Sequence, residues 1–497
     1  MTSVWLTLPV VLSLLTATGG FFVRNNHKAI NWISGSSVIL SVFCSVQLLA
    51  DITTNGPYAV AFGNWMAPFG IVFVADFLAV AMTVITAIIG AVTVFYAMAD
   101  LKHKPSYGLY HVLFHVLLAG VYGAFLTGDI FNLYVWFEVM LIASFGLMIV
   151  DAERKQIDGA VKYVLLNLIS TLVFLLAIGL TYGATGTLNL ADLHLKFPGV
   201  ETQTAALLSA LFLFTFAIKS ALFPLFAWLP ASYHTLPSAV VALFAALLTK
   251  VGVYALIRIF TLVFPLTETG WQPLLIWVSG LTMLTGVLGA ASQFDIKKIL
   301  SFHIISQIGY MIMGLALYTP IAIAGAIFYI IHHIIVKANL FLIGGFIERK
   351  YGTSQLRHLG GVYKAMPWLA FLFLIPAFSL AGFPPLSGFW GKFLVIKASI
   401  INDYNLLAAT ALVVGLLTIF SMTKIWSEAF WKAPVAKQTA VELPLSATLL
   451  YCLPIATLTV MTITIGLVAQ PFFEFANEAA EQVLNPVQYI HAVLGEP

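Results

Sequence analysis

The stretch FAIKSALFPLFAWLP, residues 216–230, decides the fold because it places a single charge and a helix breaker inside an apolar segment. A charged side chain in hydrocarbon is costly and usually lines a polar cavity or an ion path. Pro224 cannot donate to the carbonyl of Ser220, so the helix is loosened just beyond Lys219. The stretch predicts a broken membrane helix with a buried cation, which favours transport. The alternative is a lysine that reaches back to the surface.

Composition places the whole chain in a membrane. Its 497 residues are 61% hydrophobic and 9% charged, whereas ordinary soluble proteins carry about 25% charged residues. The net charge of +3 is too small to indicate a nucleic-acid partner. Cys44 and Cys452 both lie in apolar runs, so no disulfide framework or metal site is indicated. No phosphate-loop spacing is present, and we expect no cofactor.

Fourteen apolar runs are long enough to cross a bilayer as helices, which predicts an all-α polytopic membrane protein. The twelfth run is unusually long and contains Pro384 and Pro385, so we expect a broken or re-entrant pair there. The predicted spans are 4–23, 29–50, 70–98, 107–126, 130–150, 160–183, 204–229, 236–262, 273–293, 297–317, 321–347, 367–400, 406–428 and 444–470.

Loop charges predict the orientation. Basic residues concentrate in the odd-numbered loops, whereas the even-numbered loops hold only Lys196. Because cytoplasmic loops are enriched in lysine and arginine, the odd loops are expected inside a bacterial plasma membrane and both termini outside. The basic residues of the odd loops are Arg24, Lys28, Lys102, Lys104, Arg154, Lys155, Lys162, Lys297, Lys298, Arg349, Lys350, Arg357, Lys364, Lys432 and Lys437. The tail carries Glu474, Glu478, Glu481 and Glu496.

An internal repeat is indicated by the second break. Residues 221–224, ALFP, recur as AGFP at 381–384, with Lys219 before the first break and Lys392 after the second. The two motifs lie five spans apart, and an odd shift reverses the orientation across the membrane. The pattern predicts inverted five-helix repeats, with helices 1–3 at 1–106, the repeats at 107–262 and 273–430, and the last helix and acidic external tail at 431–497.

Seven basic residues fall within predicted spans. Arg258, Lys397 and Lys424 lie near span ends and are interpreted as side chains that reach the interface. Four lysines lie deeper, and a membrane protein that serves only as a scaffold has no use for them. These four are Lys219, Lys250, Lys337 and Lys392.

Glu138, in the fifth span, is the natural partner for Lys219. A buried carboxylate near a lysine stays ionised, whereas an isolated one is driven neutral. Lys250, in the eighth span, has no nearby acid in the sequence, and desolvation favours the neutral amine, which suits proton exchange. Movement of Glu138 relative to Lys219 would therefore change the proton affinity of Lys219 and pass protons toward Lys250.

The eleventh span adds histidines to this set. His333 and Lys337 are one helical turn apart on one face, and His332 points about 100° away. Histidine titrates near neutral pH and suits a proton relay. The alternative is a pair of histidines bonded to backbone carbonyls or a neighbouring helix. Lys392 would end the relay near an outward exit.

Several polar residues are assigned more loosely. Asp76 either organises helix contacts or contributes to a cation site. Lys298 is interpreted as a cytoplasmic anchor or a gate for protons, and Ser306 adds polarity to the tenth span. Asp129 and Asp151, at the ends of the fifth span, are interpreted as solvated boundary residues.

Taken together, these motifs resemble the antiporter-like subunits shared by Mrp-type cation/proton antiporters, respiratory complex I and membrane-bound hydrogenases. Within this family the chain is most similar to D-type Mrp subunits, on FNLYVWFE at 131–138, NWMAPFGIVFVADF at 64–77 and a length near 500 without the extension of A-type subunits. The resemblance also rests on DIKK at 295–298, SQIGY at 306–310, KANLFL at 337–342 and GFPP at 382–385.

The resemblance implies that Glu138 and Lys219 form the ion pair of a first half-channel. It further implies that Lys250 connects this pair through His332, His333 and Lys337 to Lys392, and that the chain works with companion subunits. The predicted function is a proton-translocating, non-enzymatic subunit of a sodium/proton antiporter. Complex I or hydrogenase is the first alternative, and a self-contained transporter of an organic substrate is the second.

Overall fold

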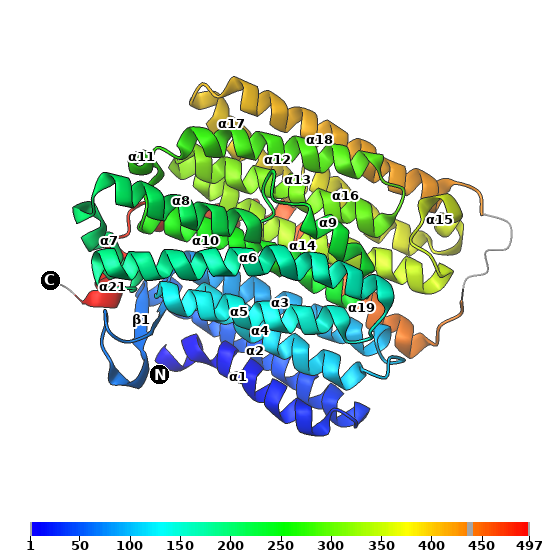
Figure 1. The fold of residues 1–497 in the computed structure, drawn as a ribbon. Coiled ribbons are helices and arrows are strands. Elements are labelled where there is room, and N and C mark those ends of the chain that lie inside the picture. Colours follow the sequence, from blue (N-terminus) through cyan, green and yellow to red (C-terminus); the bar gives the residue numbers. More distant parts are fainter. Residues whose placement is uncertain (1, 435–440, 496–497) are drawn as a thin grey trace.

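The computed structural model describes residues 2–434 and 441–495, so Lys437 and Glu496 of the predicted charge pattern lie outside the described residues. The chain folds into one bundle of long helices that run roughly side by side (Figure 1). The membrane-length helices are α1 (Thr2–Val23), α2 (His27–Asn55), α3 (Phe77–Asp100), α4 (Tyr107–Leu126), α5 (Ile130–Ile149), α6 (Arg154–Thr185), α8 (Thr202–Lys219), α10 (Ser238–Leu262), α12 (Gln272–Ser292), α13 (Ile296–Leu317), α14 (Pro320–Tyr351), α18 (Asn405–Ile425) and α19 (Leu445–Leu467).

Shorter elements complete the fold. A π-helical turn, η5 (Trp426–Trp431), extends α18, and a two-stranded antiparallel hairpin follows α2. The shorter elements are β1 (Tyr58–Ala61), β2 (Val72–Ala75), α7 (Leu190–Lys196), α9 (Trp228–Ser232), α11 (Leu266–Thr269), α15 (Val362–Ala365), α16 (Pro367–Ala381), α17 (Ser387–Ile401), α20 (Ala469–Leu484), α21 (Val487–Leu494) and the 3₁₀ turns η1 (Phe62–Asn64), η2 (Phe197–Gly199), η3 (Tyr233–Thr235) and η4 (Leu356–His358).

The predicted spans are found in the structure. Within the described residues, thirteen helices are long and apolar enough to cross a membrane, and α16 is a shorter apolar helix. The twelfth predicted span is the pair α16 and α17, broken between Ala381 and Ser387. The seventh span, predicted at 204–229, ends as a regular helix at Lys219 and continues through a turn into α9. The chain is therefore a multi-pass membrane protein with breaks where the proline motifs predicted them.

Two segments differ from the sequence prediction. The start of the third predicted span, 70–75, is strand β2 rather than helix, because β-branched residues there pair with β1. The tail after residue 470 forms α20 and α21. Helix α20 is amphipathic, with its glutamates exposed and its alanine face, including Ala476 and Ala480, buried.

The two helix breaks share one backbone arrangement. In each break, one N–H donates to the carbonyl three residues earlier, and the next N–H donates to the carbonyl five residues earlier. The two donors are Ala221 and Leu222 in the first break, and Gly382 and Phe383 in the second. Ala221 and Gly382 both have positive φ, 57° and 92°. Ala221 therefore corresponds to Gly382, one position beyond the match with Ala381 that the sequence motif gave.

A second motif also occurs twice. Asp129 and Asp295 each accept the N–H three residues on, at 2.8 Å and 3.0 Å, and so cap α5 and α13. Each also forms an isolated antiparallel bridge, to Asn189 and to Gln355 respectively. Asp129 is buried, so its interpretation as a solvated residue is wrong. Because the two motifs lie in 107–262 and 273–430, we propose that these segments are the inverted repeats.

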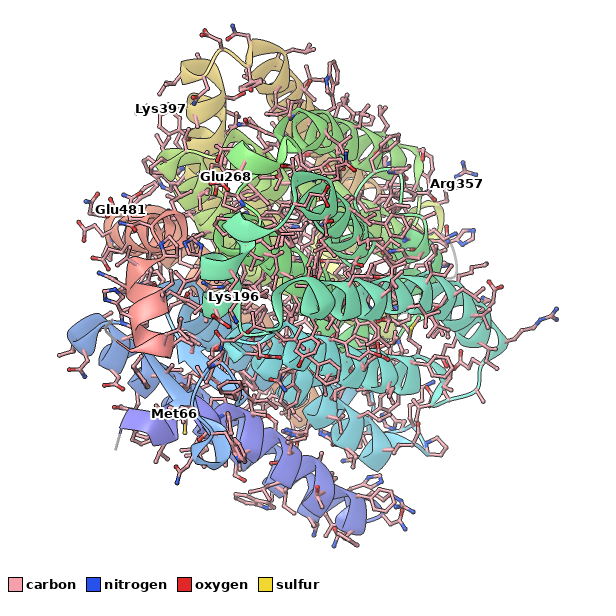
Figure 2. All side chains as sticks on the ribbon, turned by 60° about the vertical axis from the view of Figure 1, so that its left-hand side comes forward. Met66, Lys196, Glu268, Arg357, Lys397 and Glu481 are labelled. Atoms are coloured by element: carbon pink, nitrogen blue, oxygen red, sulfur yellow. The ribbon has the colours of Figure 1, made fainter. Side chains whose placement is uncertain are left out.

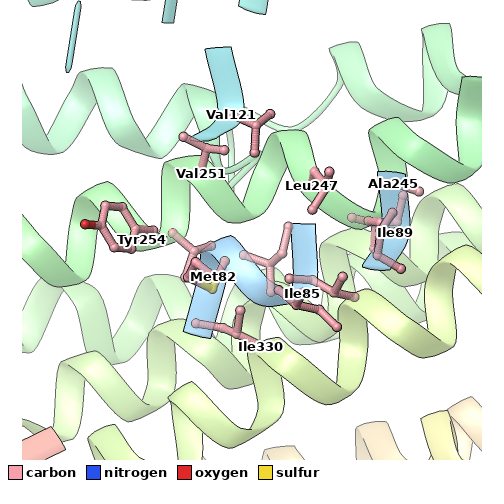
Figure 3. Close-up of a cluster of buried hydrophobic side chains, with 14 of the residues drawn as sticks. Met82, Ile85, Ile89, Val121, Ala245, Leu247, Val251, Tyr254 and Ile330 are labelled. Carbon is pink, nitrogen blue, oxygen red and sulfur yellow. The ribbon is translucent and has the colours of Figure 1, made fainter. Parts of the chain in front are cut away.

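The packing core lies where α3, α4, α10 and α14 meet. Figure 3 shows Met82, Ile85, Val121, Val251 and Ile330 from these four helices in one apolar cluster. Every residue in the most apolar window of α10 is buried, whereas α6 and α12 leave much of their surface exposed, as lipid-facing helices do. Lys250 therefore sits on the most enclosed helix.

The two ends of the bundle differ in charge. Helix α1 begins and α21 ends at the same end (Figure 1), and Met66, Glu268 and Glu481 lie toward that side while Arg357 lies on the opposite side (Figure 2). This geometry agrees with an even number of crossings.

We call the end of the bundle that carries the odd-numbered loops the basic end. There, Lys104 pairs with Asp151 at 3.1 Å, and the Asp151 side chain is largely buried rather than solvated. Partial burial acts to raise the pKa of Asp151, but hydrogen bonds from Ser106 and Tyr110 and the Lys104 ammonium outweigh it and lower that pKa.

We expect the basic end to face the cytoplasm. In a background with Cys44→Ala and Cys452→Ala, a membrane-impermeant thiol reagent added to intact cells should label Glu481→Cys and not Lys28→Cys, and permeabilisation should expose the second. The reverse pattern would invert the predicted topology.

Candidate functional site

Lys219 is the last residue of α8, directly before the first helix break. Its Nζ donates to Thr171 Oγ1 at 3.0 Å and to the Asn167 carbonyl at 3.5 Å, both on α6. The ammonium also lies 5.4 Å from the centroid of the Phe137 ring. A small cavity of about 20 Å³ adjoins it, enough for one water molecule. The lysine is thus held by neutral groups beside the break.

Glu138 does not form the predicted ion pair with Lys219 in this structure. The two side chains interact electrostatically, but Lys219 Nζ is directed to α6 and Glu138 Oε1 is buried without a hydrogen-bond partner. The physical reason is that Thr171 and Asn167 provide competing acceptors, which the sequence spacing did not reveal. Glu138 lies one residue after Phe137, on the helix that covers the ammonium.

The interval between Lys219 and Lys250 is polar and closely packed. Gly252 on α10 lies against the Lys219–Ser220 peptide, and a Cβ added there would come within 2.8 Å of backbone atoms. Ser220 Oγ and Thr249 Oγ1 are buried without partners. Lys250 Nζ donates to the carbonyl of Ala245, and its side chain is fully buried. The tight contact brings the break to the side of α10 near Lys250.

The α14 residues form the centre of the site. His333 interacts electrostatically with Lys250, Lys337, His332 and Lys392, which places these five predicted residues in one neighbourhood. Both ring nitrogens of His333 are buried and unpartnered. Lys337 Nζ donates to the Leu300 carbonyl of α13 at 3.1 Å. The ammonium groups of Lys250 and Lys337 are thus held by backbone carbonyls in this neighbourhood.

Lys392 joins this centre to the second helix break. Its Nζ donates to the carbonyls of Leu380 and Ala381, at 2.9 Å and 3.2 Å, where α16 ends. The same ammonium lies 4.5 Å from the centroid of the Tyr310 ring. His332 Nδ1 lies 2.8 Å from Ser387 Oγ, at the start of α17. The break therefore supplies the groups that hold Lys392 and His332.

The sequence also suggested two accessory residues, Ser306 and Lys298. Ser306 is buried and receives a 3.4 Å hydrogen bond from Gln307. Lys298 lines a surface cleft at the basic end. Its neighbour Lys297 was assigned only to the surface, yet it is buried, pairs with Glu348 at 2.6 Å and donates to the Leu236 carbonyl at 2.9 Å.

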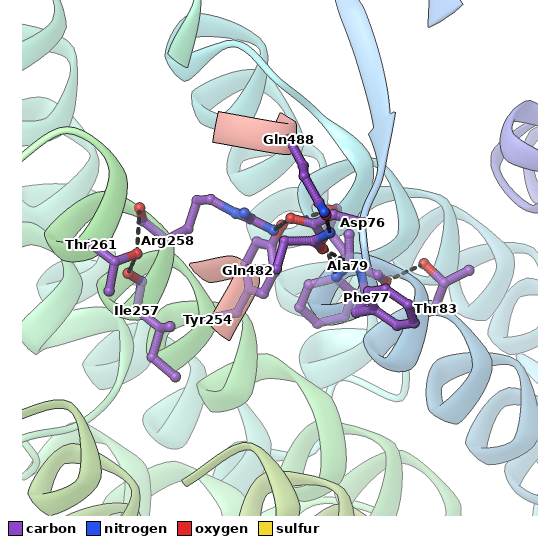
Figure 4. Close-up of polar contacts among 11 residues, drawn as sticks. Asp76, Phe77, Ala79, Thr83, Tyr254, Ile257, Arg258, Thr261, Gln482 and Gln488 are labelled. Atoms are coloured by element: carbon purple, nitrogen blue, oxygen red, sulfur yellow. Dashed lines mark hydrogen bonds and ion pairs between the residues drawn. The ribbon is translucent and has the colours of Figure 1, made fainter. Parts of the chain in front are cut away.

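Asp76 and Arg258 form a buried ion pair at the opposite end from the basic loops. Their closest atoms are 2.5 Å apart. Asp76 also accepts the Ala79 N–H at 2.8 Å and so caps α3, while Gln482 of α20 accepts the Phe77 N–H (Figure 4). The interpretation of Arg258 as a snorkelling residue is wrong, because its guanidinium is buried against this carboxylate. The contacts favour the helix-organising interpretation of Asp76.

Some of the unpartnered buried polar atoms lie on or beside the residues of this site. Buried polar groups in proteins are nearly always hydrogen bonded, often to water. Such atoms therefore mark positions where the site would hold water between its titratable groups. Those of the site belong to Glu138, Ser220, Thr249, His333, His332 and His303, and others lie elsewhere in the bundle, for example on His111 and His115. Among residues 2–434 and 441–495, no three His, Cys, Asp or Glu side chains come together as a metal site.

The fold and this set of residues define a class, the multi-pass helical membrane proteins with buried titratable side chains between two broken helices. A family profile described as NADH:quinone oxidoreductase/Mrp antiporter, TM matches residues 127–423. The chain belongs to this family.

Relatives and solved structures agree with the family. The D-type Na(+)/H(+) antiporter subunit of Alkalihalophilus pseudofirmus is 46% identical over 98% of this chain and 99% of its own length. The D-type subunit of Bacillus subtilis is 38% identical, with the same coverage. A chain of the Mrp complex from Dietzia matches with a TM-score of 0.93 and 33% identity over 99% of both chains. A chain of respiratory complex I from Thermus thermophilus matches at 0.82 and 25% identity, over 98% of this chain and all of its own.

Arg258→Met should destabilise the protein by about 3–5 kcal/mol, because it leaves the Asp76 carboxylate buried and unpaired. Adding Asp76→Asn, which keeps an α3 cap, should recover part of that loss. Lys196→Met, which removes a more exposed pair with Asp192, should cost no more than about 1 kcal/mol. Thermal unfolding of the purified assembly measures all three. Equal effects of Arg258→Met and Lys196→Met would contradict a structural role for the buried pair.

Proposed function

We propose that this chain is a proton-translocating subunit of a multisubunit sodium/proton antiporter in the bacterial plasma membrane. It acts as a transporter subunit, and not as a catalytic enzyme, with other Mrp-type subunits as its partners. The observation that carries the proposal is the group of buried titratable side chains between the two helix breaks. The similarity to proteins named as D-type Na(+)/H(+) antiporter subunits over nearly the whole chain supports it.

The relay uses three groups of residues. Glu138 and Lys219 form the first half, and Lys250 connects it to the central His332, His333 and Lys337. Lys392 then leads to the second break and the exit on the other side. Support comes from the electrostatic coupling of His333 to Lys250, Lys337, His332 and Lys392. Lys298 and Ser306 are accessory to this line.

Lys219 acts as the switch. Its ammonium alternates between neutral acceptors on α6 and the Glu138 carboxylate. Pairing with a carboxylate favours the charged lysine, whereas burial without a counter-ion favours the neutral amine. Movement between the two positions thus takes up and releases one proton. The break at Pro224 supplies the backbone freedom, since the carbonyls near it are no longer tied into a regular helix.

A role in complex I remains the second candidate because of the Thermus thermophilus match. At 25% identity that match is less specific than the 46% identity to an antiporter subunit. Redox chemistry would reside on other chains in that case.

Glu138→Ala and Lys219→Ala should each slow sodium-driven proton movement by at least about tenfold, equivalent to about 1.4 kcal/mol of barrier. The measurement is a fluorescent pH-gradient assay in inverted vesicles from antiporter-deficient cells that express the whole assembly. Glu481→Ala, on the exposed face of α20, is the matched control and should exchange at the normal rate. Full exchange in both relay variants, at normal amounts of assembled complex, would refute the relay.

A further inference from the structure

Lys424, near the end of α18, binds the frayed end of another helix. Its Nζ donates to the carbonyls of Ala291 and Gln293, at 2.7 Å and 2.6 Å, where α12 finishes. The ammonium lies 4.8 Å from the centroid of the Phe294 ring. The side chain is only partly buried and lies toward the basic end of the bundle. Its surroundings match those of the deep lysines, which neutral carbonyls also hold.

A surface cleft adjoins this lysine. The cleft has a volume of about 660 Å³ and is lined by Gln293, Lys298 and Phe302 among others. Gln293 is the residue whose carbonyl Lys424 binds at 2.6 Å. Lys424 does not line the cleft itself, but it is one hydrogen bond away from a residue that does.

One turn deeper on α18, Ser421 contacts a histidine that the proposed relay leaves unused. Ser421 Oγ lies 2.6 Å from His303 Nε2, and both side chains are fully buried. Residues three apart on a helix lie on neighbouring surface positions, about 5–6 Å between Cβ atoms. Proton transfer between the Lys424 ammonium and the Ser421 hydroxyl therefore requires a bridging water molecule.

His303 connects this pair to the centre. It interacts electrostatically with Lys337 and Lys392 on one side and with Lys424 on the other. Its second nitrogen, Nδ1, is buried without a partner. A neutral imidazole carries a proton on one nitrogen and a lone pair on the other, so it can accept a proton at Nδ1 and release one from Nε2, or the reverse.

The serine permits either tautomer of the histidine. Ser421 Oγ also lies 3.1 Å and 3.2 Å from the carbonyls of Leu417 and Thr418, so its hydroxyl can donate to the backbone. In that state Oγ accepts a hydrogen bond from Nε2–H. When the hydroxyl donates to Nε2 instead, the imidazole proton resides on Nδ1. A proton that binds at Nε2 is balanced by the one released from Nδ1, which leaves the Nε2–H tautomer. Return of the ring to the Nδ1–H tautomer, with the Ser421 hydroxyl donating to Nε2 again, completes the cycle.

We propose that Lys424, Ser421 and His303 form a side branch through which protons from the basic end reach the second half of the relay. The inference rests on the proposed function, since it needs Lys337 and Lys392 to carry protons. It gives the second repeat its own access to the side that the basic loops mark as cytoplasmic.

A purely structural role for Lys424 is the competing explanation, because cations stabilise helix C-termini. Lys424→Arg separates the two. Arginine keeps the positive charge and the donors for the Ala291 and Gln293 carbonyls but does not give up its proton. A structural cap would tolerate the change, whereas a proton-exchanging group would not.

Exchange should be measured in the same inverted vesicles, with assembled complex quantified on native gels. Lys424→Arg and Ser421→Ala should each lower the exchange rate about tenfold or more at normal complex levels, a conservative fraction of what a positioned proton-transfer group contributes. Ser421→Thr, which keeps the hydroxyl, should retain most of it. Lys397→Met, an exposed lysine on α17, is the matched control and should exchange normally.

Normal exchange by Lys424→Arg or by Ser421→Ala would overturn the branch. If Glu138→Ala and Lys219→Ala are inactive in the same experiment, only the branch has failed. If those variants are also active, the proposed relay itself is wrong.

Discussion

Backbone carbonyl oxygens, rather than carboxylates, hold three of the deep lysines of this protein. Lys250, Lys337 and Lys392 all donate to carbonyls, and Lys392 does so where α16 ends. A carboxylate partner would fix each ammonium in its charged form, whereas a neutral acceptor leaves protonation free to change. The cost of burying charge in hydrocarbon is thus reduced without removing the capacity for proton exchange.

The helix breaks follow from the same constraint. The last carbonyls of a helix are free of helical hydrogen bonds, and Lys392 uses such groups, whereas Lys250 and Lys337 share carbonyls within regular helices. The turns after Lys219 and Ala381 end two helices inside the bundle and free such groups where the axis passes. The two breaks have matching backbone hydrogen bonds, as do the capped loops at Asp129 and Asp295. Both halves of the molecule therefore contain the same type of helix break and the same type of capped loop.

Two ion pairs link helices toward the ends of the bundle. Asp76 and Arg258 link α3 to α10 at one end, with Gln482 of α20 bound alongside, and Lys297 with Glu348 links α13 to α14 at the other. In both pairs a basic side chain binds a carboxylate, whereas the deep lysines between them bind neutral groups. Fixed ion pairs at the ends and exchangeable groups in the middle suit a protein in which protons move while the helices keep their places.

The sequence by itself determined the membrane class, the spans and the positions of both breaks, because hydrophobic run length and proline act locally along the chain. It also singled out Lys250, His332, His333, Lys337 and Lys392 as polar residues within apolar runs, and the structure buries all five. Only the tertiary structure decided which group each charged side chain binds. It turned Lys219 toward Thr171 rather than Glu138, paired Arg258 with Asp76, and placed Lys424 on the end of α12 beside His303. Hydrogen-bond partners come from helices far apart in the chain, and the competition among acceptors depends on how those helices pack.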